Sequence, residues 1–316
     1  MRVLLSLAVA AAAAAADRTV SSDVAIHSVA FADGGRTLLG HGAGGSVRGW
    51  DAATGAPKLK HDSQPSPAAS ALLPESGQLA GVARDGSIEV VAIAGGKVVR
   101  RVPAVEPAAR RLVYSPDGQA VATVHQPGPV ARENTVRVRD AGGRERFTAP
   151  AGIGGISVLG FSPDGRFLVG GSNDADVRVW NARNGELVRL IDQLLVTMFA
   201  LAFSPDGKWL AMAGVDRTVY LWDTATWKLT RKLTGQPEMI SAVAFSPDGR
   251  RLAAGGFSEL TSRQPVKVLL WDVGAGKVIG TMDAPRRVSG LTFSPDGTIL
   301  AAACGEKTVT LYAVQD

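Results

Sequence analysis

Phe203-Ser204-Pro205-Asp206-Gly207 is the stretch that decides the fold, together with Trp222-Asp223 shortly after it. Ser-Pro-Asp-Gly predicts a type I turn, because proline pre-sets φ at the second position and glycine suits the fourth. Apolar residues at a spacing of two flank the copy that begins at Phe245, which predicts a β-hairpin with one buried face. The β-branched and aromatic residues of 218–223 predict a further strand.

This turn motif recurs along the chain at intervals of 41 to 48 residues, in forms that range from FSPDG to degenerate copies. The glycines that close the copies are Gly35, Gly77, Gly118, Gly165, Gly207, Gly249 and Gly297. A period of about 40–45 residues with four strands per repeat is typical of propeller blades. The repeats therefore predict an all-β fold, a seven-bladed β-propeller of four-stranded antiparallel blades, as one domain over residues 17–316.

Tryptophan closes several of these repeats. The closing dipeptides are Trp50-Asp51, Trp180-Asn181, Trp222-Asp223 and Trp271-Asp272. With them the chain resembles the WD-repeat β-propeller family from about residue 20 to residue 316. The resemblance implies structural roles for these tryptophans, and for Asp174 and Asp216 in a buried hydrogen-bond network with the indoles of Trp180 and Trp222. The histidine that the family adds to this network is missing from most repeats, so we expect apolar packing to hold more of the ring.

Residues 1–16 predict a secretory signal peptide. One positive charge precedes an apolar stretch and an alanine run that ends before Asp17. The segment is too short for a membrane span with its flanks. We therefore expect a periplasmic or extracellular protein without membrane insertion, cleaved after Ala14 or Ala16. A low-complexity alanine tail on a cytosolic protein is the alternative.

A propeller ring must also close. In the resembled family the N-terminal segment supplies the outer strand of the last blade, and alignment of the repeats places that strand near residues 15–21. After cleavage only residues 17–21 remain to form it. We expect either a very short closing strand, in which Thr19 and Val20 pair with the strand that ends at Tyr312, or an earlier cleavage.

Composition indicates little chemistry. The formal net charge is +5, and the cationic residues are spread without a run, which favours a solvated surface over a nucleic-acid-binding face. The single cysteine, Cys304, excludes an internal disulfide, and we expect it to be a small buried residue. The four histidines lack metal-ligand spacing, and no nucleophile elbow or phosphate loop occurs. The sequence therefore predicts a monomer with no catalytic residue, cofactor or metal and no nucleic-acid partner.

Binding to a protein partner is the function that remains. In WD-repeat proteins the face with the blade connections is the usual docking surface, and its positions lie four residues before each motif aromatic or one before each aspartate position. The resemblance places there His27, Arg84, Arg110, Arg132, Asn173, Phe199 and Val215, and also the serines Ser157, Ser241 and Ser289. We expect Arg110 and Arg132 to form the basic half of this surface.

Phe199 differs from its counterparts because it follows an apolar linker that contains Leu194, Leu195 and Met198. Exposed aromatic, methionine and arginine side chains are enriched at the cores of interfaces. We therefore interpret the chain as a non-catalytic exported scaffold that docks a protein partner through this linker. Two alternatives stay open: Leu195 and Met198 pack as a satellite core, or the central channel serves a periplasmic enzyme or small-ligand sensor.

Overall fold

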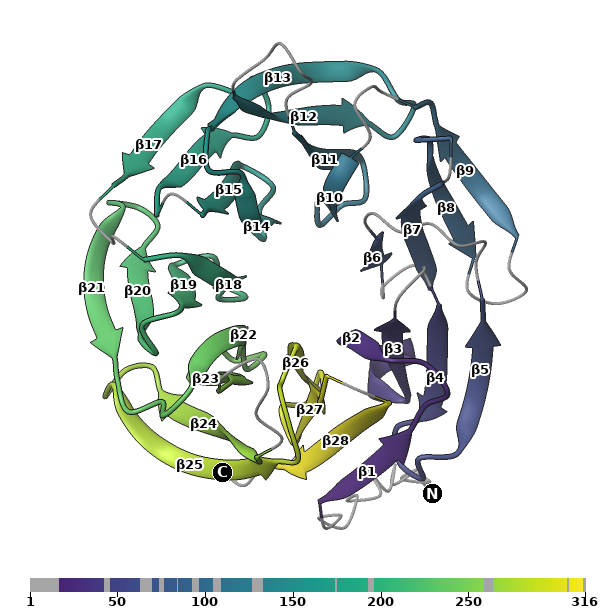
Figure 1. The fold of residues 1–316 in the computed structure, drawn as a ribbon, viewed down its shortest axis with the longest axis vertical. Helices are drawn as coiled ribbons and strands as arrows, with labels where there is room; N and C mark the ends of the chain where they lie inside the picture. Colours follow the sequence, from purple (N-terminus) through teal and green to yellow (C-terminus); the bar gives the residue numbers. More distant parts are fainter. Residues whose placement is uncertain are drawn as a thin grey trace, which may run out of the picture.

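The computed structural model describes residues 17–42, 46–62, 70–73, 77–83, 85–92, 97–104, 109–126, 133–173, 175–192, 196–258, 264–305 and 307–314. Their strands form seven antiparallel four-stranded sheets, which stand as blades around a ring (Figure 1). A 3-10 turn, η1 (Asp33–Gly35), is the only helical element in the described ranges. No described helix has the length and apolar character that a membrane crossing requires. The predicted all-β propeller with seven blades is confirmed.

The strands of each blade run from the channel outward in chain order. Blade one contains β2 (Ile26–Ala32), β3 (Thr37–Gly42), β4 (Val47–Asp51) and β5 (Pro57–His61), and blade two β6 (Ser70–Leu73), β7 (Gln78–Val82), β8 (Ile88–Ala92) and β9 (Val98–Val102). Blade three contains β10 (Ala109–Tyr114), β11 (Ala120–His125), β12 (Asn134–Asp140) and β13 (Glu145–Gly152), and blade four β14 (Ile156–Phe161), β15 (Phe167–Ser172), β16 (Val177–Asn181) and β17 (Leu187–Ile191).

The remaining blades repeat this order. Blade five contains β18 (Met198–Phe203), β19 (Trp209–Gly214), β20 (Val219–Asp223) and β21 (Lys228–Leu233). Blade six contains β22 (Met239–Phe245), β23 (Arg251–Phe257), β24 (Val266–Asp272) and β25 (Lys277–Ala284). Blade seven contains β26 (Gly290–Phe293), β27 (Ile299–Ala303) and β28 (Thr308–Ala313), and takes its outermost strand, β1 (Arg18–Ser21), from the other end of the chain.

The Ser-Pro-Asp-Gly motif forms the turn between the first and second strands of a blade. In blade five the Gly207 N–H donates to the Ser204 carbonyl at 2.8 Å, which is the hydrogen bond of a type I turn. The Ser204 hydroxyl donates to Asp206 at 2.6 Å, and Asp206 accepts the Lys208 N–H at 3.1 Å. The bond from Ser204 is the main reason that the pKa of Asp206 lies below its usual value. The same serine–aspartate contact recurs at Ser115, Ser162, Ser246 and Ser294.

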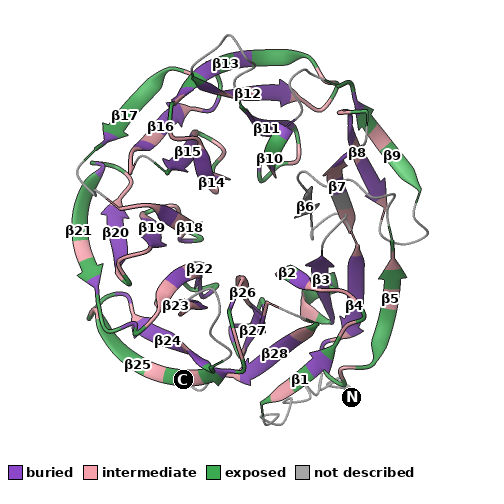
Figure 2. Cartoon of the chain, in the orientation of Figure 1, coloured by how far each residue is buried: buried purple, intermediate pink, exposed green. Residues whose placement is uncertain are grey.

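The core lies between neighbouring blades, while the outermost strands are largely exposed (Figure 2). The four predicted structural tryptophans, Trp50, Trp180, Trp222 and Trp271, are all buried. Each packs against the third strand of the preceding blade: Trp271, for example, shares a cluster with Val219 and Leu221 of blade five. Apolar contact between blades is therefore what the tryptophans contribute to the ring.

The hydrogen-bond network implied for Asp216 differs from the expectation. The carboxylate of Asp216 accepts the phenol O–H of Tyr220 at 2.6 Å and not the indole N–H of Trp222. Within the described residues the Trp222 Nε1 is buried without a hydrogen-bond partner. Burial, followed by the Asp216 carboxylate, raises the pKa of Tyr220 to about 12. Tyr220 and Trp222 share one face of β20, because alternate residues of a strand do. The Tyr220 hydroxyl is the group that reaches the Asp216 carboxylate, in the turn before the strand. Asp174 lies outside the described residues.

The ring closes by strand pairing between the two ends of the chain (Figure 1). In the register of β1 on β28, Thr19 lies opposite Thr310 and Val20 opposite Val309. The side chain of Val20 is 6% exposed and belongs to the core between blades seven and one. The predicted short closing strand is confirmed.

A β-bulge distorts the first strand of several blades close to its beginning. The ladder between first and second strand skips one residue of the first strand, because a bulge places two residues opposite one. The skipped residues are His27, Arg110, Ser157, Phe199 and Ser241. A bulge re-aims the side chain that it carries. The family resemblance assigns these same positions to docking. The bulge explains why the side chains at these positions do not point as they would in a regular strand.

Serine at or near this position links one blade to the next through its hydroxyl. Ser157 donates to the Met198 carbonyl of blade five, and Ser241 to the Val288 carbonyl before blade seven. The hydroxyl of Ser289 donates to the Ile26 carbonyl of blade one at 3.2 Å. We call these contacts hydroxyl links. Blade five has phenylalanine at the same position, so the bulge residue of that blade makes no hydroxyl link to blade six.

Strand closure predicts different costs for two neighbouring substitutions in β1. Val20→Asp should lower the free energy of unfolding by at least about 2 kcal/mol, because it buries a carboxylate without a partner. Thr19→Asp, at an exposed position on the same strand, should change it by no more than about 0.5 kcal/mol. Removing residues 17–21 altogether should expose β28 and promote aggregation. Urea unfolding and light scattering measure these effects, and equal stability of the two variants would show that closure uses other contacts.

The hydroxyl links predict a stability cost that depends on the serine removed. Ser241→Ala should lower the free energy of unfolding by about 1 kcal/mol, because the hydroxyl no longer donates to the Val288 carbonyl. Ser28→Ala is the matched control, since Ser28 follows a bulge residue but its side chain makes no hydrogen bond within the described part of the chain. Chemical denaturation should separate the two variants, and a Ser28→Ala cost as large as that of Ser241→Ala would contradict this role.

Candidate functional site

A cavity of about 230 Å³ opens where the innermost strands begin, at the mouth of the central channel. Its walls come from blades three to seven, so no single repeat builds it. The residues that line it are Arg111, Ser157, Phe199, Ser241, Phe257, Arg287 and Ser289. Three of them are bulge residues, which is why their side chains turn toward a shared space instead of pairing within a blade.

An aromatic and cationic stack forms one side of the cavity. The rings of Phe199 and Phe257 lie with centroids 6.1 Å apart and planes tilted by 36°. The guanidinium carbon of Arg287 lies 4.7 Å from the centroid of the Phe257 ring, within the range of a cation–π contact. Both rings are half-buried, whereas Arg287 is exposed. The stack therefore presents apolar surface and a positive charge side by side.

Arg111 supplies the second positive charge. Its Nε donates to the Ile156 carbonyl of blade four at 3.0 Å, which fixes the guanidinium against the channel wall. The side chain is open to the channel on one side, yet the surrounding protein desolvates it and lowers its pKa, the direction expected for a cation. Arg111 and Arg287 are the charged residues of the lining, and none of the lining residues is acidic. The cavity is thus electropositive.

The structure brings together only part of the predicted docking set. Phe199 lines the cavity. Arg110 is the bulge residue of blade three and is exposed, but its neighbour Arg111, and not Arg110, lines the cavity. His27 is exposed on blade one and is not part of the lining either. Docking through His27 and Arg110 therefore stays a prediction, and Arg111 is the arginine of β10 that lines the cavity.

Met198 corrects the prediction for the linker. Its side chain is fully buried and packs in the core with Val169 and Trp222, so it does not form part of an exposed docking surface. Adjacent strand residues point to opposite faces, and the bulge at Phe199 leaves Met198 facing inward. Met198 is therefore a core residue, in the core between blades four and five and not in a satellite cluster under the linker. Leu194 and Leu195 lie outside the described residues.

Asn173 and Val215 lie beside the linker and support it. The Asn173 carbonyl accepts the Thr197 hydroxyl at 3.4 Å, and the Val215 N–H donates to the Thr197 carbonyl at 3.2 Å. Their observed contacts therefore position the segment that leads into Phe199. Arg84 and Arg132 lie outside the described residues.

Sequence reasoning missed Phe257 and Arg287. Phe257 is the last residue of β23, directly after the Gly255-Gly256 pair, and Arg287 precedes Ser289 by two residues. Phe257 stands eight residues after its motif glycine, Gly249, as Asn173 and Val215 do after theirs. Its aligned position was therefore the signal that could have identified it.

The chemistry of this part of the molecule is that of recognition. Among the described residues no group of three or more histidine, cysteine, aspartate or glutamate side chains has the arrangement of a metal site. The Cys304 thiol is buried, and burial raises its pKa, so the reactive thiolate is disfavoured. The cavity offers apolar rings, hydroxyls and two guanidinium groups, which suit a partner with an apolar side chain and hydrogen-bond acceptors.

Comparison with known families agrees with the geometry. The family model described as "WD domain, G-beta repeat" matches the chain four times, at residues 146–181, 196–223, 227–259 and 276–312. No curated protein matches the chain significantly. The matches fall in the second half of the ring, where the turn motif and the closing tryptophans are most regular, and WD-repeat propellers generally serve as protein-interaction scaffolds. The four repeat matches and the seven-bladed ring show that the chain belongs to the WD-repeat β-propeller family.

Proposed function

We propose that the protein is a non-catalytic scaffold that docks a protein partner at the mouth of its central channel. One observation carries this proposal: blade five has Phe199 at the bulge position where blades four and six have serines that form hydroxyl links. The phenyl ring gives up that link and leaves a half-buried aromatic surface in the cavity. Large aromatic residues in partly desolvated pockets are the common anchors of protein interfaces.

The size of the cavity favours a protein partner over a small ligand. Pockets for drug-sized ligands typically measure about 300–1,000 Å³ and bury most of the ligand. At about 230 Å³, this cavity suits one or two side chains of a partner that continues over the surrounding face. A small-ligand sensor or an enzyme that uses the channel is the competing function.

The charges at the cavity define the partner further. Arg111 and Arg287 flank the aromatic stack, and no acidic residue among those that the structure describes lines the cavity. Guanidinium groups form strong, oriented hydrogen bonds with carboxylates and carbonyl oxygens. We therefore expect a partner loop that inserts an apolar side chain beside Phe199 and presents oxygen acceptors to the two arginines.

Export is a second part of the proposal. It is supported by the signal-peptide pattern of residues 1–16, which precede the first described residue of the closing blade. A docking function would then operate in the periplasm or outside the cell.

Partner capture should depend on Phe199. Phe199→Ala should weaken binding of the partner isolated from the native envelope by roughly thirtyfold or more, since truncation of an interface anchor costs at least about 2 kcal/mol. Arg287→Gln should weaken it less, by about tenfold, because one charged contact is lost. Calorimetric titration with purified partner measures both effects.

Lys208→Ala is the control, because Lys208 is an exposed residue of the turn at the opposite end of β18. It should leave capture unchanged. Loss of melting temperature in Phe199→Ala with unchanged partner affinity would make Phe199 a core residue and refute the docking site. A small molecule that raises the melting temperature of the wild type, with no protein partner captured, would favour the sensor instead.

Export has its own direct measurement. The mature protein from the native host should begin between Ala15 and Asp17, and it should be recovered from the envelope or the medium. N-terminal sequencing decides this. An intact Met1 on protein from the cytosol would contradict export without affecting the docking proposal.

A further inference from the structure

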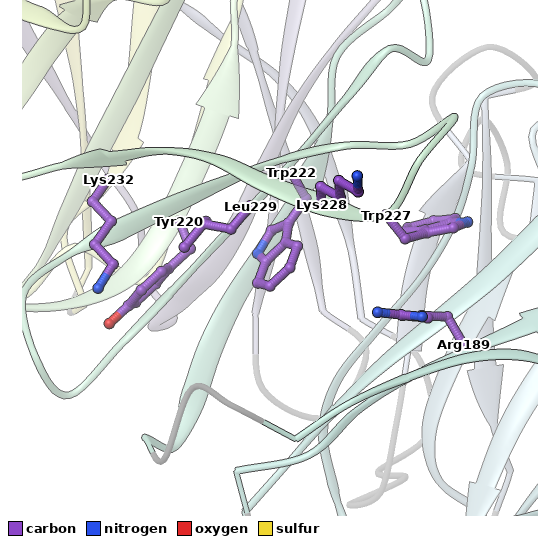
Figure 3. A pocket seen from close by; sticks show the side chains of 7 residues that line it. All are labelled: Arg189, Tyr220, Trp222, Trp227, Lys228, Leu229 and Lys232. Atoms are coloured by element: carbon purple, nitrogen blue, oxygen red, sulfur yellow. The ribbon is translucent and has the colours of Figure 1, made fainter.

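A second cavity, of about 490 Å³, lies on the outer rim between blades four and five. Arg189 of β17 forms one wall, and residues of β20, β21 and the turn between them form the other (Figure 3). We call it the rim groove. It is separate from the channel mouth, since the two cavities share no lining residue.

Trp227 is in an unusual backbone position in this groove. It is the last residue of the turn between β20 and β21, the two outer strands of blade five, and its N–H donates to the Asp223 carbonyl at 2.7 Å. Glycine occupies the same position in three other blades, as Gly55, Gly185 and Gly276, each with positive φ. Trp227 has a φ of 53°, a conformation that is costly for a bulky residue. Such outliers cluster at functional sites. Trp227 is 7% exposed and its ring packs edge-to-face against Phe167 of blade four with centroids 5.2 Å apart, so only a small part of the indole faces the groove.

The tryptophan changes how blades four and five meet. At two other interfaces an outer-strand side chain covers the turn glycine of the next blade: Phe147 lies against Gly185, and Arg231 lies against Gly276. Arg231 also donates to the Val273 carbonyl at 2.7 Å. Arg189 has the same register as these residues on its own strand but makes no such bond in the described chain. Figure 3 shows its guanidinium facing the Trp227 ring across the groove.

The rim groove carries three positive charges. Arg189, Lys228 and Lys232 are all exposed, and within the described residues none of them forms a salt bridge. The Lys232 ammonium lies 5.4 Å from the centroid of the Tyr220 ring, so the charge is held over an aromatic wall. Since no acidic residue lines the groove, its charge is available to an anionic ligand.

Trp222 adds an unused hydrogen-bond donor. The residue lines the groove and is 5% exposed, and its indole Nε1 has no acceptor among the described residues. Buried polar groups normally have partners, and an exception calls for an explanation such as a ligand. Asp216, which the family resemblance pairs with this indole, accepts the hydroxyl of Tyr220 instead.

We propose that the rim groove binds an extended acidic segment of a protein partner. Carboxylates of the segment pair with Arg189, Lys228 and Lys232, and an apolar side chain of the segment lies against the exposed Leu229. A peptide fits better than a small anion because the charges are spread over two strands of two blades. Within the described residues the outer edges of β17 and β21 also have no strand partner, so their backbone groups can bond an extended chain.

The test uses a defined probe on the whole protein. The probe is a labelled, terminally blocked peptide in which glutamates alternate with phenylalanine or leucine, and its control has glutamine at every glutamate position. Fluorescence anisotropy should give binding of the acidic peptide only, weakened at least tenfold between about 50 mM and about 300 mM salt, because salt screens exposed charges. Inorganic phosphate serves as a competitor.

Two sets of variants separate the groove from general charge. The combined Arg189→Gln, Lys228→Gln and Lys232→Gln variant should bind the acidic peptide at least tenfold more weakly. A combined Arg183→Gln, Arg250→Gln and Lys277→Gln variant loses the same charge at exposed sites outside the groove and should bind within about twofold of the wild type.

Several outcomes would overturn the proposal. Unchanged binding in the Arg189, Lys228 and Lys232 variant, or equal binding of the glutamine peptide, would show that the groove does not select acidic segments. Phosphate that displaces the peptide with a similar affinity would reduce the site to an adventitious anion site. Self-association that the same variant abolishes would make a second copy the occupant. Phe199→Ala should leave peptide binding unchanged, so failure here is distinguishable from failure at the channel mouth.

Discussion

The β-bulge at the start of the innermost strands is the constraint on which the surface of this ring depends. It removes one residue from the ladder of each affected blade, and in blades four, five and six the side chain of that residue turns toward the cavity at the channel mouth. Where that residue is Ser157 or Ser241, the hydroxyl bonds a backbone carbonyl of the next blade. With serine at the bulge, the same geometry thus holds one blade to the next. With phenylalanine, it presents an aromatic side chain to the cavity.

Blade five departs from the other repeats at two positions, although its turn motif is identical to that of three other blades. It has Phe199 in place of a linking serine at the channel, and Trp227 in place of a turn glycine at the rim. Phe199 gives up a hydroxyl link and leaves a half-buried ring, and Trp227 adopts a positive φ that suits glycine. Each of the two lines a cavity that also has cationic residues. Local choices that conflict with the fold are expected where function requires them.

The fold could be predicted from the sequence because its information is local and repeated. The Ser204–Gly207 turn fixes one hairpin, the period fixes the number of blades, and Thr19 and Val20 close the ring as predicted. The site could be predicted only in part. Phe199 was identified from its aligned position, and Phe257 could have been, because it is aligned with Asn173 and Val215. Arg111 could not, because it lines the cavity in place of the bulge residue that precedes it. Met198 was misplaced because its neighbour, and not Met198, is the bulge residue.

Photo-crosslinking from position 199 tests the central claim most directly. A photoreactive phenylalanine analogue at Phe199, which lines the channel mouth, should crosslink to the partner in the native envelope. The same analogue at Lys208, at the other end of the strand, should not. Crosslinking at position 208 but not at position 199 would contradict docking at the bulge residues and move the binding surface to the opposite face of the ring.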